Sequence, residues 1–189
     1  MNRDLLANPA PLGLMGFGMT TVLLNIHNAG FFPLSAMILA MGLCYGGLAQ
    51  VLAGLLEFKK GNTFGLTAFV SYGFFWITLV ALWVMPKLGW SEPTPPAYMG
   101  CFLLLWGLFT AFMWVGTWRA NRALQVIFGS LTLLFVLLAI RDFSGNALIG
   151  VIAGYEGIFC GLSAIYLAMA EVLEAQYGRP VLPIGQPRG

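Results

Sequence analysis

Charged residues divide the chain into long apolar stretches. Residues 5–56 contain no Asp, Glu, Lys or Arg, and the same holds for residues 61–86, 93–118 and 123–140. After Asp142, the single charge before Glu171 is Glu156. Because a membrane-spanning helix needs about 20 apolar residues, this pattern predicts an all-α, polytopic membrane protein. We expect six transmembrane helices, over residues 12–28, 34–56, 64–85, 97–118, 122–140 and 146–172, with the turn-forming residues 28–33 dividing the first stretch.

The composition supports a chain that is solvated by lipid. Hydrophobic residues make up 59% and charged residues 8%, whereas ordinary soluble domains carry about 25% charged residues. We expect one membrane domain over 1–189, with a short segment 1–11 before the first helix and a tail 173–189 after the last. The start lacks the basic region and cleavage site of a signal peptide. Cys44, Cys101 and Cys160 fall singly in different spans and are interpreted as apolar fillers rather than metal ligands.

Lysine and arginine residues are distributed unequally between the two ends of the predicted helices. With both termini on one side, seven lie there and two, Lys87 and Arg141, lie on the other; the seven are Arg3, Lys59, Lys60, Arg119, Arg122, Arg179 and Arg188. Because cytoplasmic loops carry the excess of positive charge, both termini are predicted to be cytoplasmic, in the inner membrane of a bacterium. The net charge of +2 follows from this topology, and we expect no nucleic-acid partner.

Asparagine precedes three of the predicted helices at similar spacing. Asn8, Asn62 and Asn121 are 54 and 59 residues apart, and asparagine is a favoured helix N-cap. Nine or ten residues further on lie Phe17, Tyr72 and Leu131, each about 15 Å along its helix. The chain therefore reads as three helical hairpins in parallel repeat. Coincidence is the alternative, because apolar residues fill these helices in any case and asparagine is common at helix starts.

A real repeat predicts a mechanism. Three helix N-termini would converge on the cytoplasmic side, where their partial positive charge and unpaired N–H groups favour a small anion. In the segment 8–14, the prolines would prevent an early helix start and the glycines would let a solute approach the backbone. Irregular backbone at membrane depth is tolerated where it lines a cavity or is buried in protein. Phe17, Tyr72 and Leu131 would then form an apolar ring that gates by dewetting and limits solute size.

Polar residues within the spans are further candidates for contact with a solute. Glu156 either carries a coupled proton or is a structural acid between helices. Gln50 either contacts a permeating carboxylate or forms an interhelical hydrogen bond. Thr20 and Thr21 follow Phe17, where their hydroxyls would replace water around a carboxylate or bond their own helix backbone.

Other candidates surround the predicted ring. Asn25, His27 and Asn28 lie at the outer end of the first span and are candidates for an outer vestibule, where His27 is either a pH sensor or simply solvated. Glycines in the second and sixth spans have spacings that permit close helix packing. Gly47 and Ala164 are candidates to leave the space that the ring borders.

The chain has no constellation that indicates catalysis. It contains one His, no nucleophile with a base at motif spacing, no phosphate loop and no metal cluster. We therefore expect no enzyme activity, no cofactor and no metal site, and an ATP-driven pump acting alone is not indicated.

Several blocks resemble the acetate uptake transporters, the succinate–acetate permeases. These blocks are NPAPLGL at 8–14, GGLAQVLAGLLEFKKGNTFGLTAFVSYGFFW at 46–76 and, less strictly, FLLLWGLFT at 102–110 and GYEGIFCGLSAIYLA at 154–168. The resemblance implies six helices in an architecture similar to the hexameric proton-gated urea channels, and hence a homo-hexamer. It also implies proton-coupled uptake of acetate and succinate, by symport or through a channel.

The same resemblance assigns roles to residues. It places the substrate entrance at the NPAPLGL motif and a hydrophobic constriction at Phe17, Tyr72 and Leu131; the motif residues are Asn8, Pro9, Ala10, Pro11, Leu12, Gly13 and Leu14. Two other functions stay open from the sequence: a channel for neutral solutes such as urea or amides, and a membrane scaffold or sensor that transports nothing.

Overall fold

The computed structural model describes residues 6–185, and every regular element in that range is helical. The elements are α1 (Ala10–Asn28), α2 (Ala36–Leu43), the π-helical segment η2 (Cys44–Ala49), α3 (Gln50–Lys60), α4 (Thr63–Val84), the 3-10 turn η3 (Pro86–Leu88), α5 (Pro96–Gly116), α6 (Arg122–Ser144) and α7 (Ala147–Tyr177). Because α2, η2 and α3 follow one another without a break, the chain has the six long helices that the apolar pattern predicts. The predicted tail 173–189 begins too early, since α7 continues to Tyr177.

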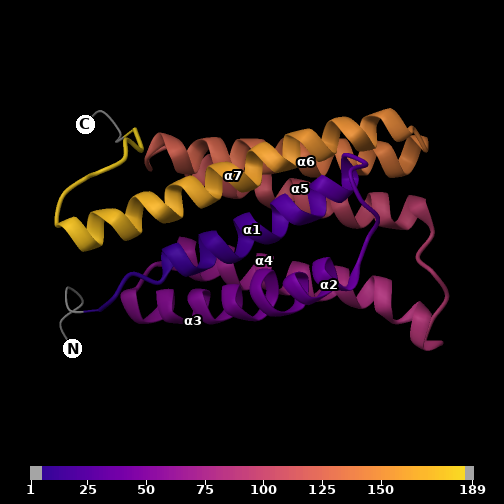
Figure 1. The fold of residues 1–189 in the computed structure, drawn as a ribbon, viewed down its shortest axis with the longest axis horizontal. Helices are drawn as coiled ribbons and strands as arrows, with labels where there is room; N and C mark the ends of the chain where they lie inside the picture. Colours follow the sequence, from indigo (N-terminus) through magenta and orange to yellow (C-terminus); the bar gives the residue numbers. More distant parts are fainter. Residues whose placement is uncertain (1–5, 186–189) are drawn as a thin grey trace.

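Five of these helices are long and apolar enough to cross a membrane: Ala36–Lys60, Thr63–Leu88, Pro96–Gly116, Arg122–Ser144 and Ala147–Tyr177. The sixth, α1, is shorter and carries Asn25, His27 and Asn28 near its end. It lies between α7 and the continuous helix formed by α2, η2 and α3 (Figure 1). Its polar residues are therefore shielded from lipid by neighbouring helices on at least two sides.

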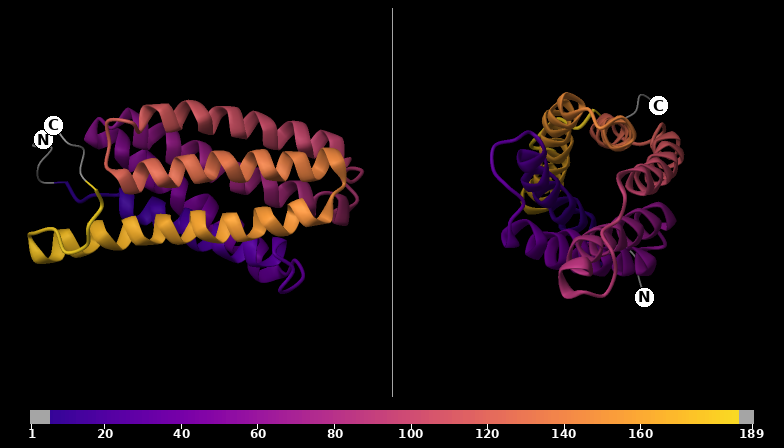
Figure 2. Two further views of the ribbon diagram at one scale, coloured as in Figure 1. Left: turned by 90° about the horizontal axis from the view of Figure 1, so that it is seen from above. Right: turned by 90° about the vertical axis from the view of Figure 1, so that its right-hand side faces the viewer.

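The six helices form a ring when the molecule is viewed end-on (Figure 2). Around this ring α1 packs against α7, α7 against α6, α6 against α5, α5 against α4, α4 against α3, and α3 against α1. Helices α1, α4 and α6 begin at the same end of the molecule, and α3, α5 and α7 end there (Figure 1). This is the parallel arrangement of three hairpins that the repeat predicts.

Glycine brings some neighbouring helices into backbone contact. A Cβ on Gly18 of α1 would lie 2.8 Å from the carbonyl oxygen of Gly161 of α7, and a Cβ on Gly161 would lie 2.7 Å from the carbonyl oxygen of Gly18. The α4–α5 seam is different, because aromatic rings separate the two backbones. Phe75 of α4 stacks on Phe102 of α5 with ring centroids 5.7 Å apart, and its centroid lies 5.2 Å from that of Trp106.

Two of the three predicted asparagine caps are present. The side chain of Asn62 accepts a hydrogen bond from the Gly65 N–H at 3.0 Å, and that of Asn121 accepts one from the Leu124 N–H at 2.8 Å. The prediction that Asn8 caps α1 was wrong. Helix α1 begins at Ala10, and Pro9 occupies the cap position. Asn8 instead accepts a longer bond, 3.3 Å, from the Ala10 N–H.

The prediction of an irregular backbone over the NPAPLGL motif was also wrong. The backbone is α-helical from Ala10, since Pro11 occupies the first turn, where the missing N–H costs nothing. Gly13 does not receive a solute, because a Cβ there would lie 2.5 Å from the ring of Phe69. This glycine makes room for an aromatic side chain. The charges Arg3 and Arg188, which the topology prediction counted, lie outside the described residues.

Candidate permeation path

Two cavities lie inside the ring of helices, one towards each end. The cavity among the starts of α1, α4 and α6, here called the cap cavity, has a volume of about 160 Å³. The second, here called the arginine cavity because Arg141 lines it, has a volume of about 90 Å³. A water molecule needs about 10–15 Å³ of such space, so each cavity has room for several waters or a small solute.

Three side chains line both cavities: Phe17, Tyr72 and Leu131. They come from α1, α4 and α6, and each is at most 6% exposed. The ring centroids of Phe17 and Tyr72 are 6.3 Å apart, and the Tyr72 hydroxyl donates a hydrogen bond of 2.9 Å to Oγ1 of Thr110. The structure thus brings together the three residues that the sequence singled out, at the boundary between the cavities. Their action as a constriction stays a prediction.

One face of α1 runs along both cavities. Ala10, Leu14 and Phe17 line the cap cavity, and Phe17, Thr21 and Asn28 line the arginine cavity. These positions are three to seven residues apart, as one face of a helix requires. Of the NPAPLGL motif, only Ala10 and Leu14 reach the cavity, and Leu12 is exposed on the opposite side of the helix.

Two of the polar residues around the cap cavity lie at helix starts. Asn62 and Asn121 line it, so the starts of α1, α4 and α6 all meet there. Each asparagine occupies one N–H group of its own helix, and a helix start has four such donors without a partner inside the helix. Gln50, the first residue of α3, also lines this cavity; it is 1% exposed, and its Oε1 has no hydrogen-bond partner. The cavity therefore offers hydrogen-bonding groups without a cation in its lining.

Two carboxylates beside the cap cavity were missed by the sequence analysis. Glu171 of α7 lines the cavity and accepts a hydrogen bond of 2.8 Å from Nδ2 of Asn8. Lys60 donates to Oδ1 of the same Asn8 at 3.0 Å. Glu57 is fully buried and accepts a bond of 2.8 Å from Nδ2 of Asn62. The signal was present in the sequence, since both acids lie at the ends of apolar stretches, but they were used only to delimit those stretches.

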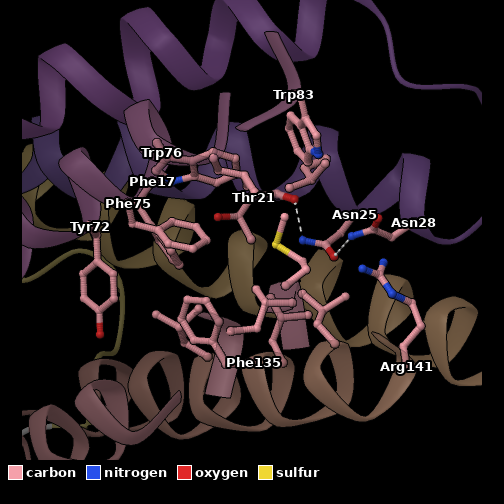
Figure 3. A pocket seen from close by; sticks show the side chains of 17 residues that line it. Phe17, Thr21, Asn25, Asn28, Tyr72, Phe75, Trp76, Trp83, Phe135 and Arg141 are labelled. Atoms are coloured by element: carbon pink, nitrogen blue, oxygen red, sulfur yellow. Dashed lines mark hydrogen bonds between the residues drawn. The ribbon is translucent and has the colours of Figure 1, made fainter. Parts of the chain in front are cut away.

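Polar side chains of α1 face Arg141 across the arginine cavity (Figure 3). Asn25 donates to the carbonyl oxygen of Thr21 at 2.9 Å, and Asn28 donates to Oδ1 of Asn25 at 3.0 Å. The Thr21 hydroxyl oxygen is buried and has no partner. Gly157 of α7 makes room for this arrangement, because a Cβ there would lie 2.2 Å from the Asn25 amide carbon. Thr21, Asn25 and Asn28 thus line the cavity, and their contact with a solute stays a prediction; the position of Arg141 in the lining was not predicted.

Outside the NPAPLGL motif, five of the predicted residues line neither cavity. The Nδ1 atom of His27 lies 2.9 Å from the carbonyl oxygen of Phe32, so His27 contacts the loop after α1. Thr20 is fully buried against Gly46 of η2, one position around the helix from Thr21. Gly47 leaves no space, since a Cβ there would lie 2.7 Å from Ile77, and Ala164 is fully buried. The fifth is Glu156.

Glu156 lies in a groove on the outside of the ring rather than in a cavity inside it. The lining of this groove includes Trp114 of α5, Trp118 just after α5, Ser130 of α6 and Phe159 of α7. The Ser130 hydroxyl donates a hydrogen bond to Glu156 Oε1. Of the two interpretations of Glu156, this geometry favours a structural acid between helices.

Comparisons with known proteins agree on one family. The model of the GPR1/FUN34/yaaH family matches residues 1–184. The succinate-acetate/proton symporter SatP of Escherichia coli (strain K12) is 62% identical over 186 residues, which cover 98% of this chain and 99% of the symporter. Acetate permease A of Emericella nidulans is 34% identical, over 94% of this chain and 65% of the permease.

A solved structure of the bacterial acetate channel SatP has the same fold. Its TM-score against this chain is 0.94 at 64% sequence identity, over 95% of this chain and 99% of the other. The six-helix ring is thus the architecture of a multi-pass membrane protein. On the match to its model and the identity to these relatives, the chain belongs to the GPR1/FUN34/yaaH family.

Proposed function

We propose that this protein transports small carboxylates, acetate and succinate, together with protons across the membrane. The observation that carries the proposal is that the cap cavity and the arginine cavity share Phe17, Tyr72 and Leu131. A solute that crosses the ring of helices lengthwise would pass between these three side chains. The names of relatives that are 62% identical and 34% identical support acetate as a substrate, and the former supports succinate and protons.

The polarity of the path suggests how the proton is involved. A carboxylate leaves the hydrogen-bonding groups of one cavity when it enters the apolar gap between Phe17, Tyr72 and Leu131. Moving an isolated ionised carboxylate into such surroundings is very costly, whereas its neutral acid is far less so. Passage of acetate with its proton would avoid this cost. Recognition by Gln50, by asparagine amides and by helix starts is weak at each contact, which suits rapid passage.

We further propose that the protein lies in the bacterial inner membrane with both termini in the cytoplasm and assembles as a homo-hexamer. The cap cavity would then open to the cytoplasm and the arginine cavity to the outside. The distribution of Lys and Arg supports the orientation, and the resemblance to the hexameric urea channels supports the assembly. Native mass spectrometry in mild detergent tests the hexamer.

The test of the function is uptake of radiolabelled acetate into proteoliposomes under an imposed pH gradient. Uptake is expected to rise when the side of addition is made acidic, and unlabelled succinate is expected to compete. Glu156→Gln is expected to keep both the uptake and its response to pH, because Glu156 lines the outer groove and neither of the two cavities. If this variant loses the pH response, Glu156 carries the coupled proton after all.

Parallel measurements separate the alternatives. Urea flux that exceeds acetate flux would indicate a channel for neutral solutes. If correctly assembled protein shows no flux of acetate, succinate or urea, the proposal of transport is contradicted. The non-transporting membrane scaffold is then the remaining alternative.

A further inference from the structure

The arginine cavity adjoins a groove at the surface of the protein. This groove lies beside η3, the start of α5 and the end of α6, and Trp83, Met99 and Arg141 line both the groove and the arginine cavity. These three residues lie at the boundary between the groove and the arginine cavity, just as Phe17, Tyr72 and Leu131 lie at the boundary between the arginine cavity and the cap cavity. A solute that moves between the groove and the arginine cavity therefore passes Trp83, Met99 and Arg141, which we call the mouth.

Arg141 supplies a positive charge at the mouth. Of the Lys and Arg side chains in residues 6–185, that of Arg141 alone lines either of the two cavities. Its Nε and Nη2 atoms each lie 2.7 Å from Oδ1 of Asp142, so the ion pair occupies two of the five guanidinium N–H donors. Asp142 lines the groove but not the arginine cavity. The carboxylate of the pair is thus not part of the cavity lining.

The surroundings of the guanidinium are suited to a carboxylate. It faces the amides of Asn25 and Asn28 (Figure 3), and the Thr21 hydroxyl deeper in the same cavity has no partner. Arg141 is partly desolvated, with 31% of its side chain exposed. Because arginine presents a rigid set of donors that matches a carboxylate, and its field is screened less at a partly buried site, an anion entering from the groove meets a favourable contact before it reaches Phe17.

We propose that Trp83, Met99 and Arg141 form a charge filter at the mouth, where Arg141 captures carboxylates and favours dicarboxylates over monocarboxylates. This inference rests on the proposed transport of carboxylates. The attraction between Arg141 and a solute is proportional to the charge of the solute. Neutralising Arg141 therefore weakens the capture of doubly charged succinate more than that of singly charged acetate.

Gly150 of α7 leaves room for the stem of Arg141. A Cβ at Gly150 would lie 2.9 Å from Cδ and 3.5 Å from Cγ of Arg141. Gly150→Ala is therefore expected to displace the guanidinium while keeping its charge. Because Cδ belongs to a flexible side chain, the displacement leaves the helix backbones in place. This variant tests the position of the charge separately from its presence.

The experiment compares KM for acetate and succinate at pH 7, where both carboxyl groups of succinate are ionised. Suppose that Arg141→Gln, which removes one unit charge, raises KM for acetate by about threefold. The lost interaction energy is twice as large for doubly charged succinate, so KM for succinate rises by the square of that factor, about tenfold. The ratio of the two KM values is expected to change by about threefold. Gly150→Ala is expected to change the ratio in the same direction and by less.

Lys87→Gln is the matched control, because it removes an equal charge from the groove, and Lys87 does not reach the arginine cavity. It is expected to change the ratio less than Arg141→Gln. An equal change in both variants would indicate a general surface potential and overturn the filter, as would an equal rise of both KM values in Arg141→Gln. If Arg141→Gln does not assemble, an unchanged ratio in Gly150→Ala overturns the proposal. Absence of acetate uptake by the unaltered protein would instead contradict the proposed function itself.

Discussion

At the scale of single residues, three side chains separate the two cavities: Phe17, Tyr72 and Leu131. Of these, Leu131 is the one whose size is easiest to change. Phe17 and Tyr72 contact each other through their rings, and Tyr72 is also hydrogen-bonded to Thr110. Leu131 of α6 is buried, at 4% exposure, and no ring contact or hydrogen bond of its side chain would be lost on truncation. Because cavities adjoin it on two sides, the cost of truncation is expected to be below the roughly 3 kcal/mol of a Leu→Ala change in a solid core.

Leu131→Ala is expected to admit larger acids. Removing the side chain widens the gap between the cavities, so the rate of lactate uptake relative to acetate should rise by at least about tenfold, the effect of one well-placed methyl-sized group on discrimination. The measurement is competition between labelled lactate and acetate in proteoliposomes. Leu105→Ala is the control, since Leu105 is 68% exposed on the outside of the ring. A size limit that is identical in both variants would exclude Leu131 from the constriction.

The sequence contains enough information to find Phe17, Tyr72 and Leu131 but not the whole site. Asn62 and Asn121 mark the starts of two helices, and a fixed rise per residue then determines which residues share a depth. The same reasoning does not reveal which side of a helix faces inward, so Thr20 and Thr21 were equal candidates. Rotation about the helix axis is decided by packing against neighbours, as the contact of Thr20 with Gly46 illustrates.

At the scale of elements, η2 explains why Gln50 reaches the cap cavity. An inserted residue in a π-helical turn rotates the following part of a helix by about 100°, and Gln50 follows η2 directly. The segment η2 packs closely on α1, where a Cβ on Gly16 would lie 2.5 Å from the carbonyl oxygen of Tyr45. Apolar composition does not distinguish a π-helical turn from an α-helical one, so η2 was not predictable from the sequence.

Close packing of α1 on α7 gives a prediction about stability. Gly18→Ala is expected to push the two backbones apart, because the new Cβ would meet the carbonyl oxygen of Gly161 at 2.8 Å. Such overpacking costs about 1–3 kcal/mol and should lower Tm by several degrees, as measured by thermal unfolding in detergent. In Gly116→Ala the nearest atom is in the ring of Phe64, at 3.3 Å, and this control should unfold near the temperature of the unaltered protein. Equal Tm values for all three proteins would contradict the backbone contact.

At the scale of the whole molecule, the positive charges lie mainly at one end of the ring. Lys59, Lys60, Arg119, Arg122 and Arg179 are at or beyond the ends of α3, α5 and α7 and the start of α6, whereas Lys87 and Arg141 are at the opposite end. The sequence determines this partition once the helix count is known, since each helix reverses the direction of the chain. It does not reveal the ring, because the neighbours of a helix depend on contacts between distant segments, such as those of α1 with α7.

This asymmetry predicts the orientation in the membrane. Positively charged loops stay in the cytoplasm, so a fluorescent protein fused after Gly189 should fold and fluoresce, and alkaline phosphatase at the same point should be inactive. Fusion of alkaline phosphatase after Ser91, between η3 and α5, should be active. Exchanging Lys87 for Gln removes a positive charge from the opposite end, which strengthens the bias and should leave the pattern unchanged. Active phosphatase after Gly189 would reverse the assignment, and the arginine cavity would then face the cytoplasm and could not capture carboxylates from outside.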